Sequence, residues 1–158
     1  MTKHTLIAEP GSHMITLTRE FDAPRELVFK VMTDPKLVSQ WWGARNTTTT
    51  VDKMEAKAGG SWRFVDHDAD GNEFAFHGVY HDVTSPERLV YTFEFEGMPG
   101  HVLLETIVLE ARGDKTFVTD SSVFQSVEAR DGMLEAGLSE GAAESWSMMD
   151  ELLEAMKV

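Results

Sequence analysis

Hydrophobic and polar residues alternate along much of the chain, beginning with the segment ITLTREF at residues 15–21. Such a period of two is typical of a strand with one buried face. Between about residues 47 and 124, similar segments rich in β-branched and aromatic residues are separated by short turns. The expected strands cover residues 47–51, 61–65, 73–83, 87–96, 101–111 and 115–124. Short connections of this kind favour an antiparallel meander, and the Asp-Gly turn at residues 70–71 predicts a hairpin.

Two regions show helical spacing instead. After Asp22, a candidate cap, and Pro24, the stripe of Leu27, Val28, Val31 and Met32 predicts a helix, and Asp34-Pro35 predicts a second, short helix that Gly43 ends. Residues 126–157 form the second helical region. Its apolar face repeats at intervals of three and four residues, through Ala142, Trp146, Met149, Leu153 and Met156. Glycines at 132, 137 and 141 predict that this helix is bent or interrupted.

The order of these elements indicates an α+β fold: a strand, two short helices, a curved antiparallel sheet and a long C-terminal α-helix. One helix cannot cover both faces of such a sheet, so the sheet is expected to curl around it and to leave a cavity between them. We expect residues 14–158 to form a single domain and residues 1–13 to be a flexible leader.

Composition narrows the classes of function. The chain of 158 residues has no cysteine, which excludes disulfides, thiolate metal sites and thiol catalysis. Its net charge of −13 makes nucleic acid and anionic membranes poor partners. No run of about 18 apolar residues and no signal core occurs, so we expect a cytoplasmic protein without membrane insertion. A homodimer formed through an exposed strand or helix edge stays open.

Metal and cofactor sites are not expected. His77 and His81 would share one face of a strand at about 13 Å from each other, too far for one ion. The acidic run DHDADGNE at residues 66–73 lacks the length and the flanking helices of a calcium loop. No phosphate loop, dinucleotide fingerprint or Ser-His-Asp motif is present.

Polar side chains on the expected strands are candidates for acid–base chemistry, because a titratable group that faces an apolar cavity has a perturbed pKa. These candidates are Arg63, His77, Tyr80, Glu94, Glu105 and Asp120. The simpler interpretation, which we favour, places them on the solvated outer face. Alternation alone does not tell which face of each strand meets the helix.

Large apolar side chains are numerous enough to line a cavity as well as fill a core. The predicted ligand-binding residues are Trp41, Trp42, Trp62, Phe64, Phe76, His77, Tyr80, Phe93, Met133, Trp146 and Met149. Adjacent residues at a helix end point about 100° apart. We therefore expect one of Trp41 and Trp42 to pack in the core and the other to line the mouth of the cavity.

Three segments resemble one known family. TREFDAPRELVFKVMTDPKLVSQWWG (18–43), FHGVYHDVTSPERLVYTFEFEGMPG (76–100) and ARDGMLEAGLSEGAAESWSMMDELLE (129–154) are similar to bacterial members of the START-like, or SRPBCC, superfamily. The nearest group is the family homologous to the activator of the heat-shock-protein-90 ATPase. The resemblance covers residues 14–157 and implies a helix-grip (START-like) fold with a deep apolar cavity.

What this resemblance implies for function is broad, because the superfamily includes lipid and hormone carriers, polyketide cyclases and hydroxylase domains. The eukaryotic namesake of the family, which binds a chaperone, carries an additional N-terminal domain. A chaperone partner is therefore doubtful for this chain. The first hypothesis is binding of a small hydrophobic or aromatic molecule without a cofactor. A cyclase- or hydrolase-type enzyme that uses cavity polar residues, and a co-chaperone-like interaction domain, are the alternatives.

Overall fold

The computed structural model describes residues 4–157, which contain one eight-stranded antiparallel sheet and four helices. The strands are β1 (His4–Ile7), β2 (Met14–Phe21), β3 (Thr48–Met54), β4 (Ser61–His67), β5 (Glu73–Thr84), β6 (Arg88–Phe95), β7 (Val102–Arg112) and β8 (Lys115–Val123). The helices are α1 (Arg25–Thr33), α2 (Pro35–Val38), α3 (Val127–Glu135) and α4 (Leu138–Ala155). The predicted strands and helices therefore occur in the predicted order.

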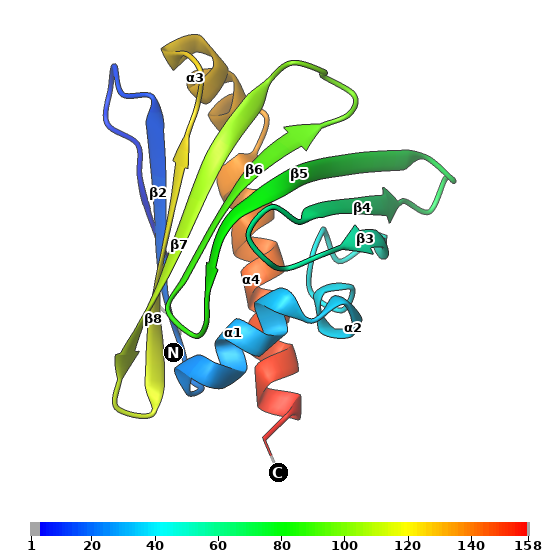
Figure 1. Ribbon diagram of the computed structural model, residues 1–158. Helices are drawn as coiled ribbons and strands as arrows, with labels where there is room; N and C mark the ends of the chain where they lie inside the picture. The colour runs from blue at the N-terminus through cyan, green and yellow to red at the C-terminus, as the bar shows by residue number, and fades with distance from the viewer. Residues whose placement is uncertain (1–3, 158) are drawn as a thin grey trace.

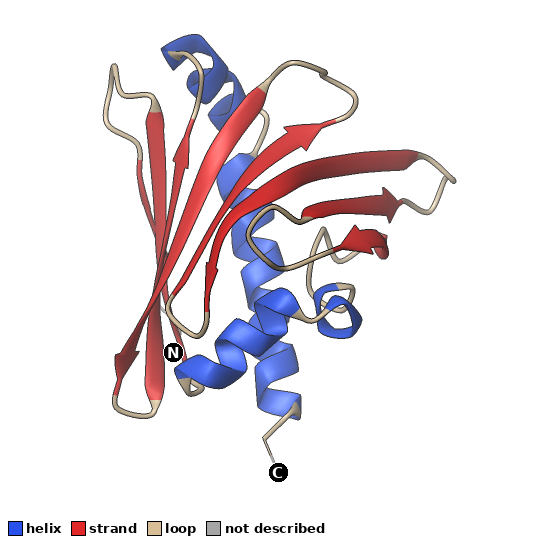
Figure 2. Ribbon diagram, in the orientation of Figure 1, coloured by secondary structure: helices blue, strands red, loops and turns tan. Residues whose placement is uncertain are grey.

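The sheet curves around one side of α4, and its strand order is β1-β2-β8-β7-β6-β5-β4-β3 (Figure 1). Strands β3 to β8 pair as a meander, and β2 pairs with β8. The last strand in the sequence therefore lies next to an N-terminal strand, and β1 and β3 form the two edges of the sheet. The helices α1 and α2 lie beside α4, where α1 contacts α4, β7 and β8 and α2 contacts β3 (Figure 2). The predicted α+β architecture, a curved sheet that wraps a long C-terminal helix, is confirmed.

The core lies between the concave face of the sheet and the helices. Strand β2 shows the alternation most clearly, because Ile15, Leu17, Arg19 and Phe21 are buried and the residues between them are not. On α4, Trp146 and Leu153 project into the same core. A register shift between Tyr80 and Asp82 interrupts the pairing of β5 with β6, and irregularities of this kind increase the local bend of a sheet.

The N-terminal stretch differs from the predicted leader. Residues His4–Ile7 form β1, an edge strand that pairs with β2 in the register His4 to Arg19 and Leu6 to Leu17. Residues 1–3 of the expected leader lie outside the described residues. A four-residue strand with no clear alternation of its own gives little sequence signal, and its order comes from the edge that β2 offers.

Helix boundaries depart from the prediction in two places. Pro24, not Asp22, is the N-cap of α1, and Asp22 instead pairs with Lys157, with 3.1 Å between Oδ2 and Nζ. The second helix is shorter than expected, because α2 ends at Val38 and the two tryptophans follow it in a turn. Asp34 caps α2 by accepting a hydrogen bond from the backbone N–H of Lys36.

The predicted interruption of the C-terminal helical region occurs at Gly137. This residue has a φ of +92° and separates α3 from α4. Glycine reaches this left-handed conformation without the steric cost that a Cβ would add. The kink lets α3 leave the axis of α4 at the end of the sheet where β6 and β7 are joined (Figure 1).

Candidate ligand-binding cavity

A cavity of about 450 Å³ lies between the concave face of the sheet and the first half of α4. Inward-facing residues of β4 to β8 form its roof, and the segment from Trp41 to Ala44 forms one side. On the helix side the cavity is lined by the small residues Gly141, Ala142 and Ser145 of α4, by Gly137 just before the helix, and by Leu138 and Trp146 at the two ends of this stretch. Small side chains on the helix and large ones on the sheet leave the space between them open. Its size falls in the range of pockets that hold small organic molecules.

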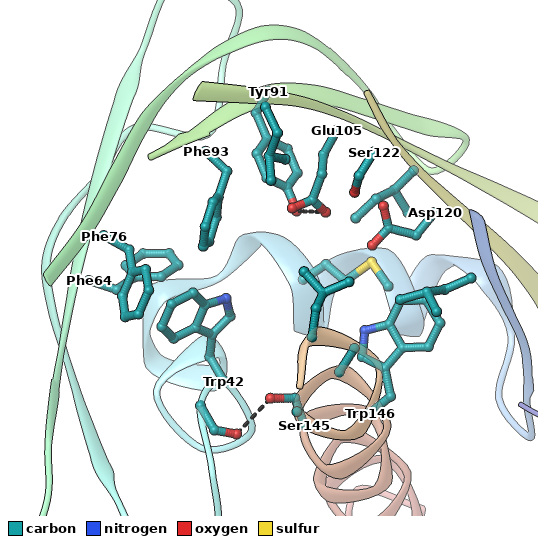
Figure 3. A pocket seen from close by; sticks show the side chains of 18 of the residues that line it. Trp42, Phe64, Phe76, Tyr91, Phe93, Glu105, Asp120, Ser122, Ser145 and Trp146 are labelled. Carbon is teal, nitrogen blue, oxygen red and sulfur yellow. Dashed lines mark hydrogen bonds between the residues drawn. The ribbon is translucent and has the colours of Figure 1, made fainter. Parts of the chain in front are cut away.

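One end of the cavity is aromatic (Figure 3). The ring of Trp42 meets Phe64 and Phe76 edge-to-face, with ring centroids 5.1 Å and 5.0 Å away. Phe93 lies 5.4 Å from Phe76, and Trp62 lies 4.7 Å from Phe64. Edge-to-face pairs at these distances stabilise a fixed arrangement of rings. The cluster therefore presents flat apolar surfaces to whatever enters the cavity.

The two adjacent tryptophans have different environments. Trp41 is 8% exposed, and its indole N–H donates to the carbonyl of Val31 at 2.9 Å. Trp42 is partly exposed and packs against Phe64 in the aromatic cluster described above. Gly43 follows with a φ of +92°, and the Ser145 hydroxyl donates to its carbonyl at 2.6 Å. This bond fixes the tryptophan segment to α4, on the far side of the cavity from the sheet.

The other end of the cavity is polar and holds two carboxyl groups (Figure 3). Glu105 on β7 and Asp120 on β8 are diagonal neighbours, because Glu105 pairs with Ser122 and Asp120 pairs with Ile107. The Tyr91 hydroxyl donates to Oε2 of Glu105 at 2.9 Å. Asp120 is only 8% exposed, and its Oδ1 has no hydrogen-bond partner in the described part of the chain.

Burial controls the charge of this carboxyl pair. Burial and the nearby charge of Glu105 raise the pKa of Asp120 well above its ordinary value, and burial also raises the pKa of Glu105. Glu105 is partly buried and lines the cavity. Two like charges this close disfavour each other, so the pair retains a proton to higher pH than free carboxyl groups do. Burial likewise raises the pKa of Tyr91, which stays a neutral donor.

A third carboxyl group borders the cavity near the tryptophan segment. Asp66 on β4 is buried, and burial raises its pKa. The Thr49 hydroxyl lies 2.7 Å from Asp66 Oδ1 and 2.7 Å from the carbonyl oxygen of Trp42. A Cβ added at Gly43 would approach the Asp66 carboxyl oxygens to 3.1 Å, so this contact favours glycine at position 43. The acid therefore helps to hold the tryptophan segment against the sheet.

Comparison with known proteins agrees with this geometry. A family model described as Activator of Hsp90 ATPase homolog 1-like protein matches residues 22–154. The chain belongs to this family. No curated protein matches it significantly.

Solved structures of other members of this fold come from bacteria. Protein Ms6760 from Mycobacterium smegmatis is 23% identical, with a TM-score of 0.86 over 96% of this chain and 97% of that one. A protein from Arthrobacter aurescens is 24% identical, with a TM-score of 0.89 over 97% and 92%. CalU16 from Micromonospora echinospora is 19% identical, with a TM-score of 0.65 over 97% and 86%. At these identities the likeness shows the shared helix-grip fold.

Most of the residues that the sequence predicted for the cavity of this Hsp90-activator-like chain do line it. They are Trp41, Trp42, Trp62, Phe64, Phe76, Tyr80, Phe93, Met133 and Trp146. Two predicted residues do not. Met149 is 0% exposed within the core, so it offers no surface to a ligand. His77 lies on the outer face of β5 because its neighbour Phe76 faces inward, and its Nδ1 is 2.9 Å from Glu96 Oε2.

The six acid–base candidates divide evenly between the two faces. Arg63, His77 and Glu94 lie on the outer face, as the favoured interpretation predicted, where Arg63 Nε is 2.8 Å from Glu96 Oε2. For Tyr80, Glu105 and Asp120 that interpretation is wrong, because all three line the cavity. The signal that could have placed the two acids is the strand parity. Glu105 stands between the buried Leu103 and Ile107, and Asp120 shares the parity of the buried Val118.

Sequence reasoning missed Tyr91, Ser122 and Asp66 as residues of the cavity wall. Each shares its strand parity with aromatic or aliphatic residues that face the helix. Within residues 4–157, no cluster of three or more His, Asp or Glu side chains could hold a metal ion. In that same part of the chain, the helices are too short or too polar to cross a membrane.

Proposed function

We propose that this protein binds a small hydrophobic or aromatic molecule in the cavity between the sheet and α4. The single observation that carries the proposal is the cavity itself, a space of about 450 Å³ with an aromatic wall in a family fold that wraps a helix. Protein interiors are otherwise close-packed, and a cavity of this size is large enough to bury most of the surface of a small ligand. A bound ligand would gain dispersion contacts with the side chains that line the cavity.

The architecture of the wall supports a ligand with at least one flat ring. Trp42, Phe64 and Phe76 stand edge-to-face around one end of the cavity, and Phe93 extends the same surface. A ring inserted there would meet both ring faces and ring edges, which is the geometry that aromatic pairs prefer.

The test combines mass and stability. Native mass spectrometry of protein purified from its own host is expected to show a bound small molecule. Saturation with 2-(2-naphthyl)ethanol at about a hundred times its Kd is expected to stabilise the fold by about 2.7 kcal/mol, which raises Tm by roughly 5–10 °C. His77→Ala, on the outer face, serves as the matched control and should give the same shift. A protein without bound molecules that also shows no shift across a panel of apolar rings would contradict the proposal.

Acid–base catalysis is a second candidate, favoured by the carboxyl pair. A carboxyl group with a raised pKa keeps its proton to higher pH than a free one and can act as a general acid toward a bound substrate. The proton retained by the pair of Glu105 and Asp120 and the unpartnered oxygen of Asp120 provide donor and acceptor positions at one end of the cavity. An enzyme would convert a cavity ligand to product and lose that turnover on Asp120→Asn. Release of every bound ligand unchanged would speak against catalysis.

A further inference from the structure

The carboxyl groups that border the cavity limit the charge of the ligands that it can bind. Three carboxyl groups border the cavity, Asp66, Glu105 and Asp120, and no Lys, Arg or His is among its lining residues in the described part of the chain. The chain as a whole carries a net charge of −13. The cavity therefore offers no cation to neutralise a ligand carboxylate or phosphate, and a buried anion beside these acids would be strongly disfavoured.

The acid end also holds an unsatisfied acceptor. Asp120 is more than nine-tenths buried and points toward the cavity, and its Oδ1 accepts no hydrogen bond from residues 4–157 (Figure 3). Buried polar atoms are nearly always hydrogen-bonded, so an orphaned oxygen beside an open space indicates a missing donor. Tyr91 already uses its only proton on Glu105, so it cannot supply that donor.

From these observations we infer that the ligand is an aromatic amine, with its ring among Trp42, Phe64, Phe76 and Phe93 and its ammonium group on Glu105 and Asp120. This inference rests on the proposed binding function. An ammonium group brings three donors and one positive charge to a pair of acids that receives one hydrogen bond from Tyr91 and has no cation among the other residues that line the cavity. It would bind the orphaned oxygen and replace the proton that the pair otherwise holds.

The spacing between the two ends fits a short linker. Tyr91 joins them, because its ring lies 6.0 Å from Trp62 in the aromatic cluster and its hydroxyl lies 2.9 Å from Glu105. A ligand that follows the same path needs an aromatic group and an amine separated by only a few atoms.

Three probes of similar size separate charge from shape. They are 2-(2-naphthyl)ethylamine, which is a cation at neutral pH, the neutral 2-(2-naphthyl)ethanol and the anionic 2-naphthylacetate. Isothermal titration calorimetry at pH 7 is expected to show the amine binding roughly tenfold or more tightly than the alcohol, since hydrogen bonds to charged groups exceed neutral ones by that order. The anion is expected to bind most weakly.

Variants assign the preference to the carboxyl pair. In the double variant Glu105→Gln/Asp120→Asn, which keeps the side-chain shapes, the amine should fall to the affinity of the alcohol. Glu94→Gln is the matched control, because it removes one carboxylate from the outer face of β6. It should leave the preference unchanged. Near-ultraviolet circular dichroism verifies that each variant is folded.

The outcomes are distinct. Equal affinity of amine and alcohol, tighter binding of the anion, or a preference that survives in the folded double variant would each overturn the amine inference and leave cavity binding in place. No binding of any of the three probes would overturn both.

Discussion

Replacing Gly141 with leucine should stabilise the fold and at the same time narrow the cavity. Gly141 is in the first turns of α4, where its N–H donates to the carbonyl of Gly137 at 3.0 Å, and it borders the cavity. A Cβ at this position would meet no heavy atom within 4 Å. Gly132 in α3 is a matched control, because it is also helical and also open around its Cβ, but it does not border the cavity.

The expected magnitudes follow from helix propensity and burial. Leucine is more favourable than glycine in a helix by roughly 0.5–1 kcal/mol, so each variant should gain that much. For a chain of this length the gain corresponds to a Tm about 1–4 °C higher. At position 141 the new side chain would occupy space that a ligand uses. Loss of burial for about two ligand methylene groups, at about 0.8 kcal/mol each, lowers the affinity roughly tenfold.

Differential scanning calorimetry and titration with 2-(2-naphthyl)ethanol measure both effects. Gly141→Leu should show a higher Tm with weakened binding, and Gly132→Leu should show a higher Tm with binding equal to the parent protein. Equal binding by both variants would refute the assignment of the cavity as the ligand site. A lower Tm for Gly141→Leu would contradict the conclusion that a side chain at position 141 has open space around its Cβ.

Three further results are expected. Trp41→Phe leaves the buried carbonyl of Val31 without its donor and should cost roughly 1–3 kcal/mol in urea unfolding. Burial raises the pKa of Asp120, so the folded state keeps this proton to higher pH than the unfolded chain does, and the stability linked to it is lost as the pH rises through the folded pKa. Asp120→Asn should therefore gain stability relative to the parent as the pH rises above about 4, the ordinary pKa of an aspartate, and a constant difference would contradict this. Gly78→Ala should prevent native folding, seen as lost near-ultraviolet dichroism, because its Cβ would lie 1.8 Å from the carbonyl oxygen of Thr92.

The fold could be predicted because its signals are local. Alternation in β2, the turn at Gly71 and the three-four spacing on α4 each depend on residues close in sequence. The strand β1 could not be predicted, since its four residues are ordered by pairing with β2 and not by a pattern of their own. The prediction that Asp22 caps α1 was wrong for a related reason, because Asp22 pairs with Lys157 near the other end of the chain.

The site was predictable only in its apolar part. Aromatic residues at alternate positions, such as Trp62 and Phe64, indicate an inward face whatever the register. A charged residue indicates an outward face instead, since a lone acid on a strand is usually solvated. Glu105 and Asp120 become a pair only through the register of β7 on β8, which brings positions fifteen residues apart in sequence to diagonal contact. His77 shows the opposite error, where a chemically attractive residue lies one position away from the inward-facing Phe76.

The side chains of α4 explain why this fold keeps a cavity instead of a filled core. From its middle onward, Trp146, Met149 and Leu153 are buried in the core. In its first half the same helical face carries Gly141 and Ala142, so the helix surface recedes while the sheet continues to curve over it. A cavity lined by small residues on one helix can be narrowed by one substitution at little conformational cost. Its open state is therefore a property of the side chains on α4 and not of the backbone, which is why the size of residue 141 should control binding without disturbing the fold.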